Sequence, residues 1–478
     1  MTDSDTPRGR RPALAVASAG YFFVLLDVTI VNVALARIGS GLGGSRSELQ
    51  WVVDGYALVL AAGMLGMGDL ADRMGSRRLF LGGMALFGAA SALCAAAPGA
   101  AVLIGARAVQ GLGAAAILPS SLAIVNQLFP DDDERPKAIG IWAALGGSAL
   151  VLGPILGGVL VGPLGWRAIF WLNVPLVSAA LIGGIATLPA GSTAKAARPD
   201  LWGQGLGTAA LAALVFALIE GGNGGFASVP ALVGLVVAVA AFAGFIAVER
   251  RLSDAPQGAA RRPLLDLSWF RRAEFSGANA GAGLMNLGTL GGLFALGLYL
   301  QQDEGLSPLE AGLALVPLAA PLAALTPFTG RLVARVGGRL PAGIGLAMSG
   351  VGYLGVALVG GPAIDSPAGW AFLLLAGTGM GIAVPGLVAG ATEALGPDRA
   401  GIASAVNNTS RQVGGAIGVA LIGGLSSIST ALTFSASALL LGGLLALGLM
   451  RRGEFLSLCE RIAPQRQRPW RESRSMTE

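Results

Sequence analysis

The sequence of 478 residues has no histidine, and it contains only two lysines and two cysteines. Without histidine, the chain has no histidine-ligated metal, no Ser-His-Asp or Cys-His catalytic arrangement and no histidine proton relay. Lys137 and Lys195 each precede alanine, so the Gly-Lys-Ser/Thr sequence of a phosphate-binding loop is missing. Cys94 and Cys459 lie far apart in the sequence and in expected membrane depth, so we expect no disulfide. These absences predict no metal, no cofactor, no direct use of ATP and no enzymatic activity.

Charged residues are also scarce. They make up 12% of the chain, whereas a typical soluble domain has about 25%. Apolar residues make up 54%, and the mean hydropathy is +0.70. This composition predicts a chain surrounded mostly by lipid, in which the 75 glycines suit close helix–helix contacts. The net charge of +5 is too small and too dispersed to indicate a nucleic-acid partner.

Fourteen apolar runs are long enough to cross a membrane, since one crossing needs about 20 residues. They lie at 13–36, 51–70, 79–97, 101–125, 138–161, 168–188, 203–221, 228–248, 275–300, 309–331, 340–360, 368–391, 401–425 and 430–450. With fourteen crossings both termini lie on one side, and the segments on that side hold 27 of the 32 basic residues. Because basic residues concentrate in cytoplasmic loops, we expect both termini in the cytoplasm and a multi-pass protein of the cytoplasmic membrane.

A short sequence pattern recurs after the second and the tenth run. The segments 68–77 and 330–339 share glycine, leucine, arginine, glycine and arginine at one fixed offset. The repeat predicts an all-α integral membrane protein with two parallel six-helix bundles, at 1–190 and 273–450. A linker with two inserted helices would occupy 191–272, and a basic tail would occupy 451–478. Parallel halves are typical of transporters that bind their substrate between the halves near the midplane.

Three acidic residues within or at the ends of these runs are candidates for proton coupling. Asp27 is in the middle of the first run, where a charge costs roughly 2.5–3.5 kcal/mol. Proton or cation binding would explain this position, since proton coupling without histidine must use carboxylates. A hydrogen bond that packs two helices is the alternative. Asp54 and Glu220, at run ends, are further candidates for proton coupling, although both positions also suit a solvated carboxylate.

Two arginines lie within the runs and need partners there. Arg107 is followed one turn later by Gln110, and it could adjust the Asp27 site, contact substrate or clamp two helices together. Arg411 shares a helical stripe with Asn407, and this pair could serve as a clamp or gate or could contact substrate.

Two further motifs are candidates for positions at which the two halves move relative to each other. The fifth run contains Gly153-Pro-Ile-Leu-Gly-Gly158, in which proline bends the helix and the glycines allow close contact. A bent helix with a small face, around Gly153 and Pro154, suits a seam between moving halves. The turn after the second run carries Asp72 and Arg73, which could pair across the halves and separate when that side opens.

Together these motifs resemble the major facilitator superfamily, and more narrowly its fourteen-helix drug/proton antiporters of the methylenomycin-resistance type. The segment 26–35 is similar to the first-helix motif of that family, and 68–75 is similar to the superfamily loop motif. The segment 107–111 resembles the fourth-helix motif associated with proton transfer, and 153–158 resembles the antiporter motif of helix five.

The resemblance covers nearly the whole chain, including the two inserted helices. Ser76 stands where a basic residue is usual, beside Arg77 and Arg78. Ala149 replaces a motif glycine, which leaves the antiporter signature slightly degraded.

The resemblance implies proton-driven export of a small amphipathic compound by alternating access, with protons and membrane lipids as further partners and a monomeric chain. Asp27 would carry the proton, Arg107 would tune it, and Asp72 with Arg73 would latch the cytoplasmic gate. Acidic residues in the cavity would favour cationic drugs. The candidate substrate contacts, chosen by residue type and by run, are Phe22, Phe23, Asn32, Gln110, Asn286, Asn407 and Arg411.

Other functions fit the same sequence. The chain could export one endogenous metabolite, lipid or siderophore, with drug resistance incidental. It could also be a membrane receptor or lipid-binding scaffold that transports nothing. The intact residues Asp27 and Arg107 and the loop motif argue against the receptor, and the helix-five motif disfavours uptake by symport.

Overall fold

The computed structural model describes residues 7–130, 134–189, 200–254, 263–360, 364, 366–396, 399–425 and 427–450. The N-terminal half comprises α1 (Pro7–Leu42), α2 (Arg46–Met74), α3 (Ser76–Ala95), α4 (Ala100–Leu128), α5 (Arg135–Leu164) and α6 (Arg167–Thr187). The inserted pair is α7 (Leu201–Gly224) and α8 (Val229–Ser253), followed by a 3-10 turn at Leu267–Arg271. The C-terminal half comprises α9 (Ala273–Gln302), α10 (Pro308–Ala314), α11 (Val316–Val336), α12 (Arg339–Val359), α13 (Pro367–Leu395), α14 (Ala400–Gly423) and α15 (Ile428–Leu449).

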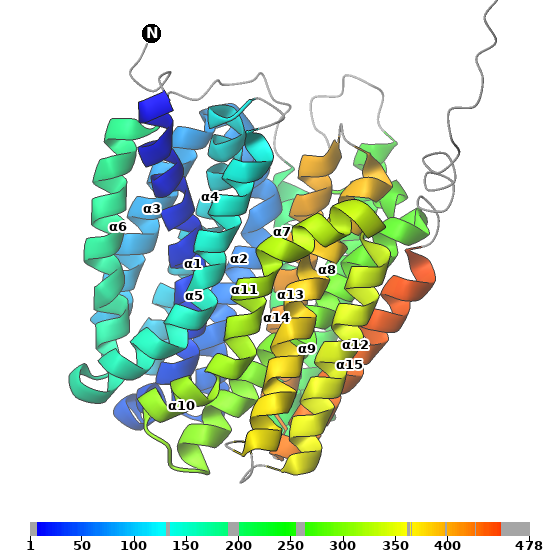
Figure 1. The fold of residues 1–478 in the computed structure, drawn as a ribbon. Helices are drawn as coiled ribbons and strands as arrows, with labels where there is room; N and C mark the ends of the chain where they lie inside the picture. Colours follow the sequence, from blue (N-terminus) through cyan, green and yellow to red (C-terminus); the bar gives the residue numbers. More distant parts are fainter. Residues whose placement is uncertain are drawn as a thin grey trace, which may run out of the picture.

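The described helices form two bundles that stand side by side (Figure 1). In the N-terminal half α1 packs against α4, α5 and α6, and in the C-terminal half α9 packs against α13, α14 and α15. The helix α7 packs against both α2 and α14, so the inserted pair contacts both halves. We call the side on which α1 begins the N-terminal face and the opposite side the far face.

Eleven of the described helices are long and apolar enough to cross a membrane. The helices α2, α11 and α14, at three further predicted crossings, are not among them. The chain is therefore a multi-pass helical membrane protein. The fourteen crossings and the cytoplasmic location of the termini stay predictions, and the basic tail at 451–478 lies outside the described residues.

The tenth predicted crossing is not one helix, which corrects the sequence-based expectation. Helix α10 ends at Ala314, and α11 begins at Val316 with Pro317 in its first turn. Proline has no N–H to donate and its ring clashes with the carbonyl four residues earlier, so an unbroken helix is disfavoured here. The N–H of Leu315 instead bonds to the carbonyl of Gly312. The result is a short helix, α10, at the far face.

The recurring sequence pattern has a structural basis. The C-cap of α2 is Gly75, whose φ is 86°, and the C-cap of α11 is Gly337, whose φ is 77°. Their N–H groups close the helices on the carbonyls of Ala71 and Val333. Residues with a side chain rarely adopt such φ values, so each repeat needs its glycine to turn the chain between two helices.

Candidate functional site

Asp27 is fully buried inside the N-terminal half, and every partner that the structure gives its carboxylate is a donor. Its Oδ2 accepts from the Nη1 of Arg107, with which it forms a salt bridge. Its Oδ1 accepts from the Nε2 of Gln110 at 2.9 Å and from the Nδ2 of Asn173 at 3.2 Å. Three donors on one carboxylate suit the ionised form, because a protonated carboxyl would need an acceptor for its own hydrogen.

Arg107 is 1% exposed and is held on several sides. Its Nη1 also donates to the Oε1 of Gln110 at 2.9 Å, and its Nε donates to the carbonyl of Val52 at 3.1 Å. The guanidinium lies 4.2 Å from the centre of the Tyr56 ring and 5.9 Å from that of Phe170. These contacts compensate part of the cost of removing the cation from water.

Close helix contacts at glycines position this pair. A Cβ on Gly111 of α4 would lie 2.4 Å from the carbonyl oxygen of Tyr56, so only glycine lets α4 approach α2 here. A Cβ on Gly153 of α5 would lie 2.0 Å from the Oγ1 of Thr29. That hydroxyl donates across to the carbonyl of Ala149 at 3.1 Å. The first-helix motif and the helix-five motif therefore pack directly against each other.

The sequence-based interpretation missed Asn173, Ser91 and Tyr56. The Nδ2 of Asn173 also donates to Ser91 at 3.2 Å, and the hydroxyl of Ser91 donates to the carbonyl of Phe170 at 2.9 Å. A polar residue inside the sixth apolar run was a usable signal for Asn173. Ser91 and Tyr56 carried no such signal, because small hydroxyls and aromatic residues also occur in ordinary helix packing.

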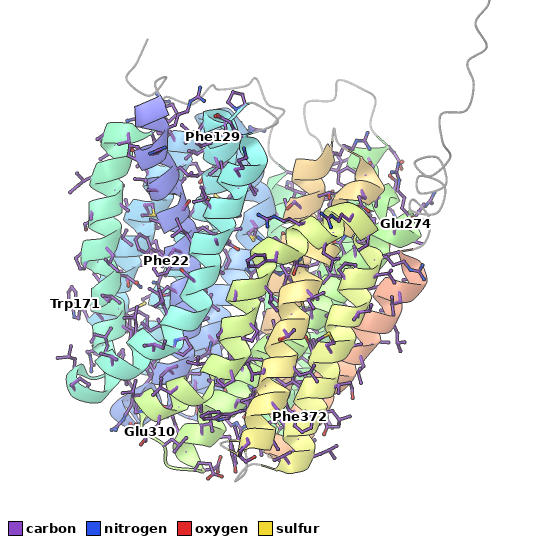
Figure 2. All side chains as sticks on the ribbon, viewed as in Figure 1. Phe22, Phe129, Trp171, Glu274, Glu310 and Phe372 are labelled. Carbon is purple, nitrogen blue, oxygen red and sulfur yellow. The ribbon has the colours of Figure 1, made fainter. Side chains whose placement is uncertain are left out.

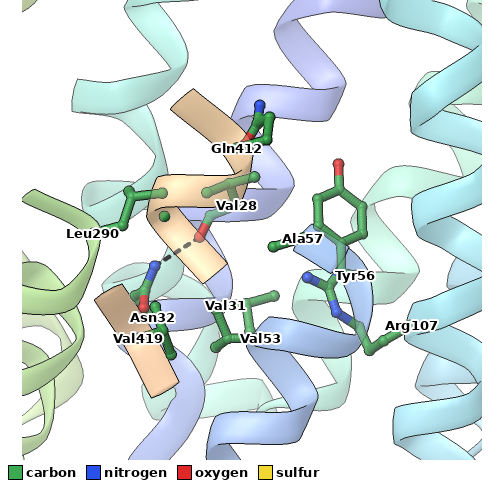
Figure 3. Close-up of a pocket in the computed structure, with 11 residues that line it drawn as sticks. Val28, Val31, Asn32, Val53, Tyr56, Ala57, Arg107, Leu290, Gln412 and Val419 are labelled. Carbon is green, nitrogen blue, oxygen red and sulfur yellow. Dashed lines mark hydrogen bonds between the residues drawn. The ribbon is translucent and has the colours of Figure 1, made fainter. Parts of the chain in front are cut away.

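A narrow cavity of about 20 Å³ lies between the two halves, next to this pair. Such a volume holds about one water molecule. Figure 3 shows Arg107 and Tyr56 on one side of it, and Asn32, Leu290, Gln412 and Val419 on the other. Asp27 itself does not line the cavity, so the arginine is the member of the ion pair that faces the seam.

The two halves are in tight contact at the far face. The Nη2 of Arg46 donates to the carbonyl of Leu425 at 2.9 Å. A Cβ on Gly312 of α10 would lie 2.4 Å from the carbonyl oxygen of Pro154, and one on Gly158 would lie 2.4 Å from the Cα of Leu309. The helix-five motif thus faces α1 with Gly153 and the C-terminal half with Pro154 and Gly158.

We expect Gly312→Ala to shift the protein away from this closed far face. The added methyl meets a backbone carbonyl, and overpacking of this kind costs about 1–3 kcal/mol. Spin labels at Ser40 and Asp303, which are exposed near the far ends of α1 and α9, would report the separation by electron–electron double resonance. Gly162→Ala in α5 is the matched control, since a Cβ there meets nothing within 4 Å. Unchanged label distances in Gly312→Ala would contradict the role of this contact.

The other candidates for proton coupling and gating are not part of the Asp27 cluster. Asp54 is fully buried in α2, and neither of its carboxylate oxygens has a partner among the described residues. Glu220 is half-buried in the last turns of α7. Arg73 lies in the last turn of α2, whereas the side chain of Asp72 lies outside the described residues. The predicted latch between these two therefore stays a prediction.

Several predicted substrate contacts have other surroundings. Phe23 packs in the hydrophobic core of the N-terminal half instead of lining the seam cavity, and Phe22 packs against the same core (Figure 2). The Nδ2 of Asn407 donates to the carbonyl of Ala278 at 3.3 Å and so joins α14 to α9.

The remaining predicted contacts divide between two places. Gln110 belongs to the Asp27 cluster, while Asn32 lines the cavity and donates to the carbonyl of Val28 at 2.7 Å. Asn286 in α9 is 7% exposed, and Arg411 in α14 has a buried Nε without a partner among the described residues.

Comparison with known proteins agrees with this architecture. The chain is 36% identical over 467 residues to the methylenomycin A resistance protein of Streptomyces coelicolor, covering 94% of each chain. It is 37% identical over 410 residues to the multidrug resistance protein Stp of Mycobacterium tuberculosis, covering 86% of this chain and 74% of Stp. It is 34% identical over 422 residues to the tetracenomycin C resistance and export protein of Streptomyces glaucescens, covering 87% of this chain and 76% of that protein.

Solved structures support the fold. The peptide transporter POT in complex with sulfate superposes with a TM-score of 0.68 at 18% identity, covering 94% of each chain. The human organic anion transporter MFSD10 superposes with a TM-score of 0.63 at 18% identity, covering 92% of this chain and 100% of that one. The family model of the major facilitator superfamily matches residues 17–419. The chain therefore belongs to the major facilitator superfamily.

Proposed function

We propose that this protein is a proton-coupled antiporter that exports amphipathic drugs or antibiotics across the cytoplasmic membrane by alternating access. The relatives named for antibiotic and multidrug resistance support drug export. The observation that supports proton coupling is the buried ion pair of Asp27 and Arg107, whose arginine faces the seam between the halves.

The cluster suggests how a proton could be exchanged for substrate. Protonation of Asp27 removes the charge that holds Arg107, so the guanidinium is released toward the cavity that it lines. Gln110 can follow this change, because its amide donates to Asp27 and accepts from Arg107. A released guanidinium would occupy this small cavity, whereas substrate in the cavity would keep Arg107 on the ionised Asp27. Proton and substrate would therefore exclude each other, as exchange requires.

The contacts at the far face suggest which state this is. If the N-terminal face is cytoplasmic, Arg46, Pro154 and Gly158 close the external end of the seam. The small cavity would then be reached from the cytoplasm, as needed for drug loading. Alternating access would separate these contacts and join the halves at the N-terminal face.

The expected preference for cationic drugs does not follow from Asp27. Its carboxylate is neutralised by Arg107 and does not line the cavity, so a bound substrate meets the guanidinium and the Tyr56 ring first. We therefore expect neutral aromatic compounds to be accepted as well as cations.

Proton flux in everted vesicles tests the proposal. Energised vesicles that contain the protein would be exposed in turn to a lipophilic cation, a neutral aromatic antibiotic and a siderophore-like amphiphile. We expect at least one of the first two compounds to collapse the pH gradient, and vesicles without the protein to show no response. A response restricted to the third compound would instead indicate an exporter of an endogenous metabolite. Substrate binding without any proton flux would indicate a receptor.

A further inference from the structure

A larger cavity, of about 390 Å³, lies away from the seam, between α2 and the inserted helix α7. Its α2 wall is a single helical stripe that runs from Val59 to Arg73, and Leu112 of α4 and Leu264 contribute to the rest. The amide of Gln204 in α7 donates to the carbonyl of Ala62 and joins the two helices there. We call this cavity the α2–α7 groove. Nothing in the proposed transport cycle uses it.

At the N-terminal face, one end of the groove is lined by Asp200, and Glu249 of α8 lies next to Asp200. Asp200 is 2% exposed, and its Oδ1 accepts from the N–H of Gly203 at 3.0 Å at the start of α7. Glu249 of α8 is fully buried, and its Oε2 accepts from the N–H of Leu265 at 3.1 Å. The other oxygen of each carboxylate, Oδ2 of Asp200 and Oε1 of Glu249, has no partner among the described residues.

The two unpartnered oxygens converge on one point. A Cβ on Gly203 would lie 2.1 Å from the Oδ2 of Asp200 and 2.8 Å from the Oε1 of Glu249. Two buried carboxylates that face each other repel unless a proton or a cation lies between them. Asp200 also lines the groove, so a cationic group in the groove can contact this member of the pair.

The same end of the groove presents a positive charge. Arg73 lines it, and the buried Nε of this arginine has no hydrogen-bond partner among the described residues. The ion pairs among the described residues include none between Arg73 and Asp200. The groove thus offers a separate donor and a separate acceptor at one end, and apolar side chains such as Val59, Met67 and Leu70 along the rest of its length.

We propose that the α2–α7 groove binds a phospholipid with a primary amine in its headgroup. The ammonium group would lie against Asp200 and Glu249, and the phosphate would lie against Arg73. An acyl chain would follow the apolar stripe of α2. Leu201 and Trp202, which are 73% and 69% exposed beside the groove, would contact the rest of the lipid in the bilayer. A purely anionic headgroup would leave the acids unmatched, and a trimethylammonium headgroup has no N–H to donate.

Photo-crosslinking with the full-length protein in vesicles tests this assignment. The probe is phosphatidylethanolamine with a diazirine in one acyl chain, and the reference probe is the matching phosphatidylcholine. We expect the first probe to label 59–70 and 201–208 about tenfold more than the second, as the loss of charge-assisted hydrogen bonds predicts. Asp200→Asn should reduce this labelling to the level of the reference probe, because asparagine keeps the helix cap but removes the charge.

Asp266→Asn is the matched control. Asp266 caps the neighbouring 3-10 turn through the N–H of Ser268 and does not line the groove. Equal labelling by the two probes, or full labelling of Asp200→Asn, would overturn the proposal. The proposal would also be overturned if a photoreactive export substrate labelled these segments and added phosphatidylethanolamine did not reduce that labelling.

A second pair of variants tests the groove without changing Asp200, which also caps α7. Thr208→Phe puts bulk into the groove, whereas Gly205→Phe adds the same ring one turn earlier, where a Cβ meets nothing within 4 Å. We expect Thr208→Phe alone to lose labelling. Loss in both variants or in neither would contradict binding in the groove.

Discussion

Asp27→Asn should reduce substrate-driven proton flux to the level of vesicles without the protein. The amide of asparagine can still accept from Gln110 and Asn173, but it cannot exchange a proton near neutral pH. The loss should appear for every exported compound, because it concerns the proton step and not a particular substrate. The measurement is the collapse of the pH gradient in everted vesicles, with the amount of inserted protein determined in each preparation.

Two controls separate loss of coupling from loss of structure. Asp303→Asn changes an exposed carboxylate beyond the end of α9 and should leave proton flux intact. The double variant Asp27→Asn/Arg107→Gln has no unpaired buried charge, so it should fold even if the single variant does not. It should still lack proton flux. Proton flux at the level of the unchanged protein in Asp27→Asn or in the double variant would remove Asp27 from the mechanism.

The sequence was informative about residues whose placement in a predicted membrane-spanning run costs free energy. Asp27 and Arg107 were identifiable because a charge in an apolar run needs a reason. Apolar run length located the helices, and the glycine repeat located two equivalent turns. The break between α10 and α11 was missed because Pro317 lies inside an otherwise continuous apolar run.

The sequence was uninformative about which helix faces which. Phe23 was assigned to the seam, yet it lies one turn before Asp27 on the stripe of α1 that faces the core of its own half. Val28 and Asn32 of the same helix line the seam cavity instead. Asn173 reaches Asp27 only because α6 packs against α1, and the carboxylates of Asp200 and Glu249 meet only through the α7–α8 packing. Such pairings depend on tertiary packing, which no local pattern encodes.

Arg107→Gln should destabilise the protein by about 3–5 kcal/mol, because it leaves the fully buried carboxylate of Asp27 without a counter-charge. Reversible unfolding in mixed micelles would measure this loss. Arg167→Gln is the matched control. Arg167 donates to the carbonyl of Ala97 at 3.0 Å and has no carboxylate partner among the described residues. We therefore expect this variant to lose only about 0.5–1.5 kcal/mol of unfolding free energy.

The double variant Asp27→Asn/Arg107→Gln decides whether this loss comes from the ion pair. If the cost is the unpaired charge, adding Asp27→Asn to Arg107→Gln should restore stability. The two substitutions should then show an interaction free energy of about 3 kcal/mol or more, because the double variant regains what Arg107→Gln alone loses. Additive losses would mean that Arg107 stabilises the fold through Val52, Tyr56 and Phe170 instead. In that case protonation of Asp27 would not release the arginine, and the proposed exchange of proton for substrate would lose its physical basis.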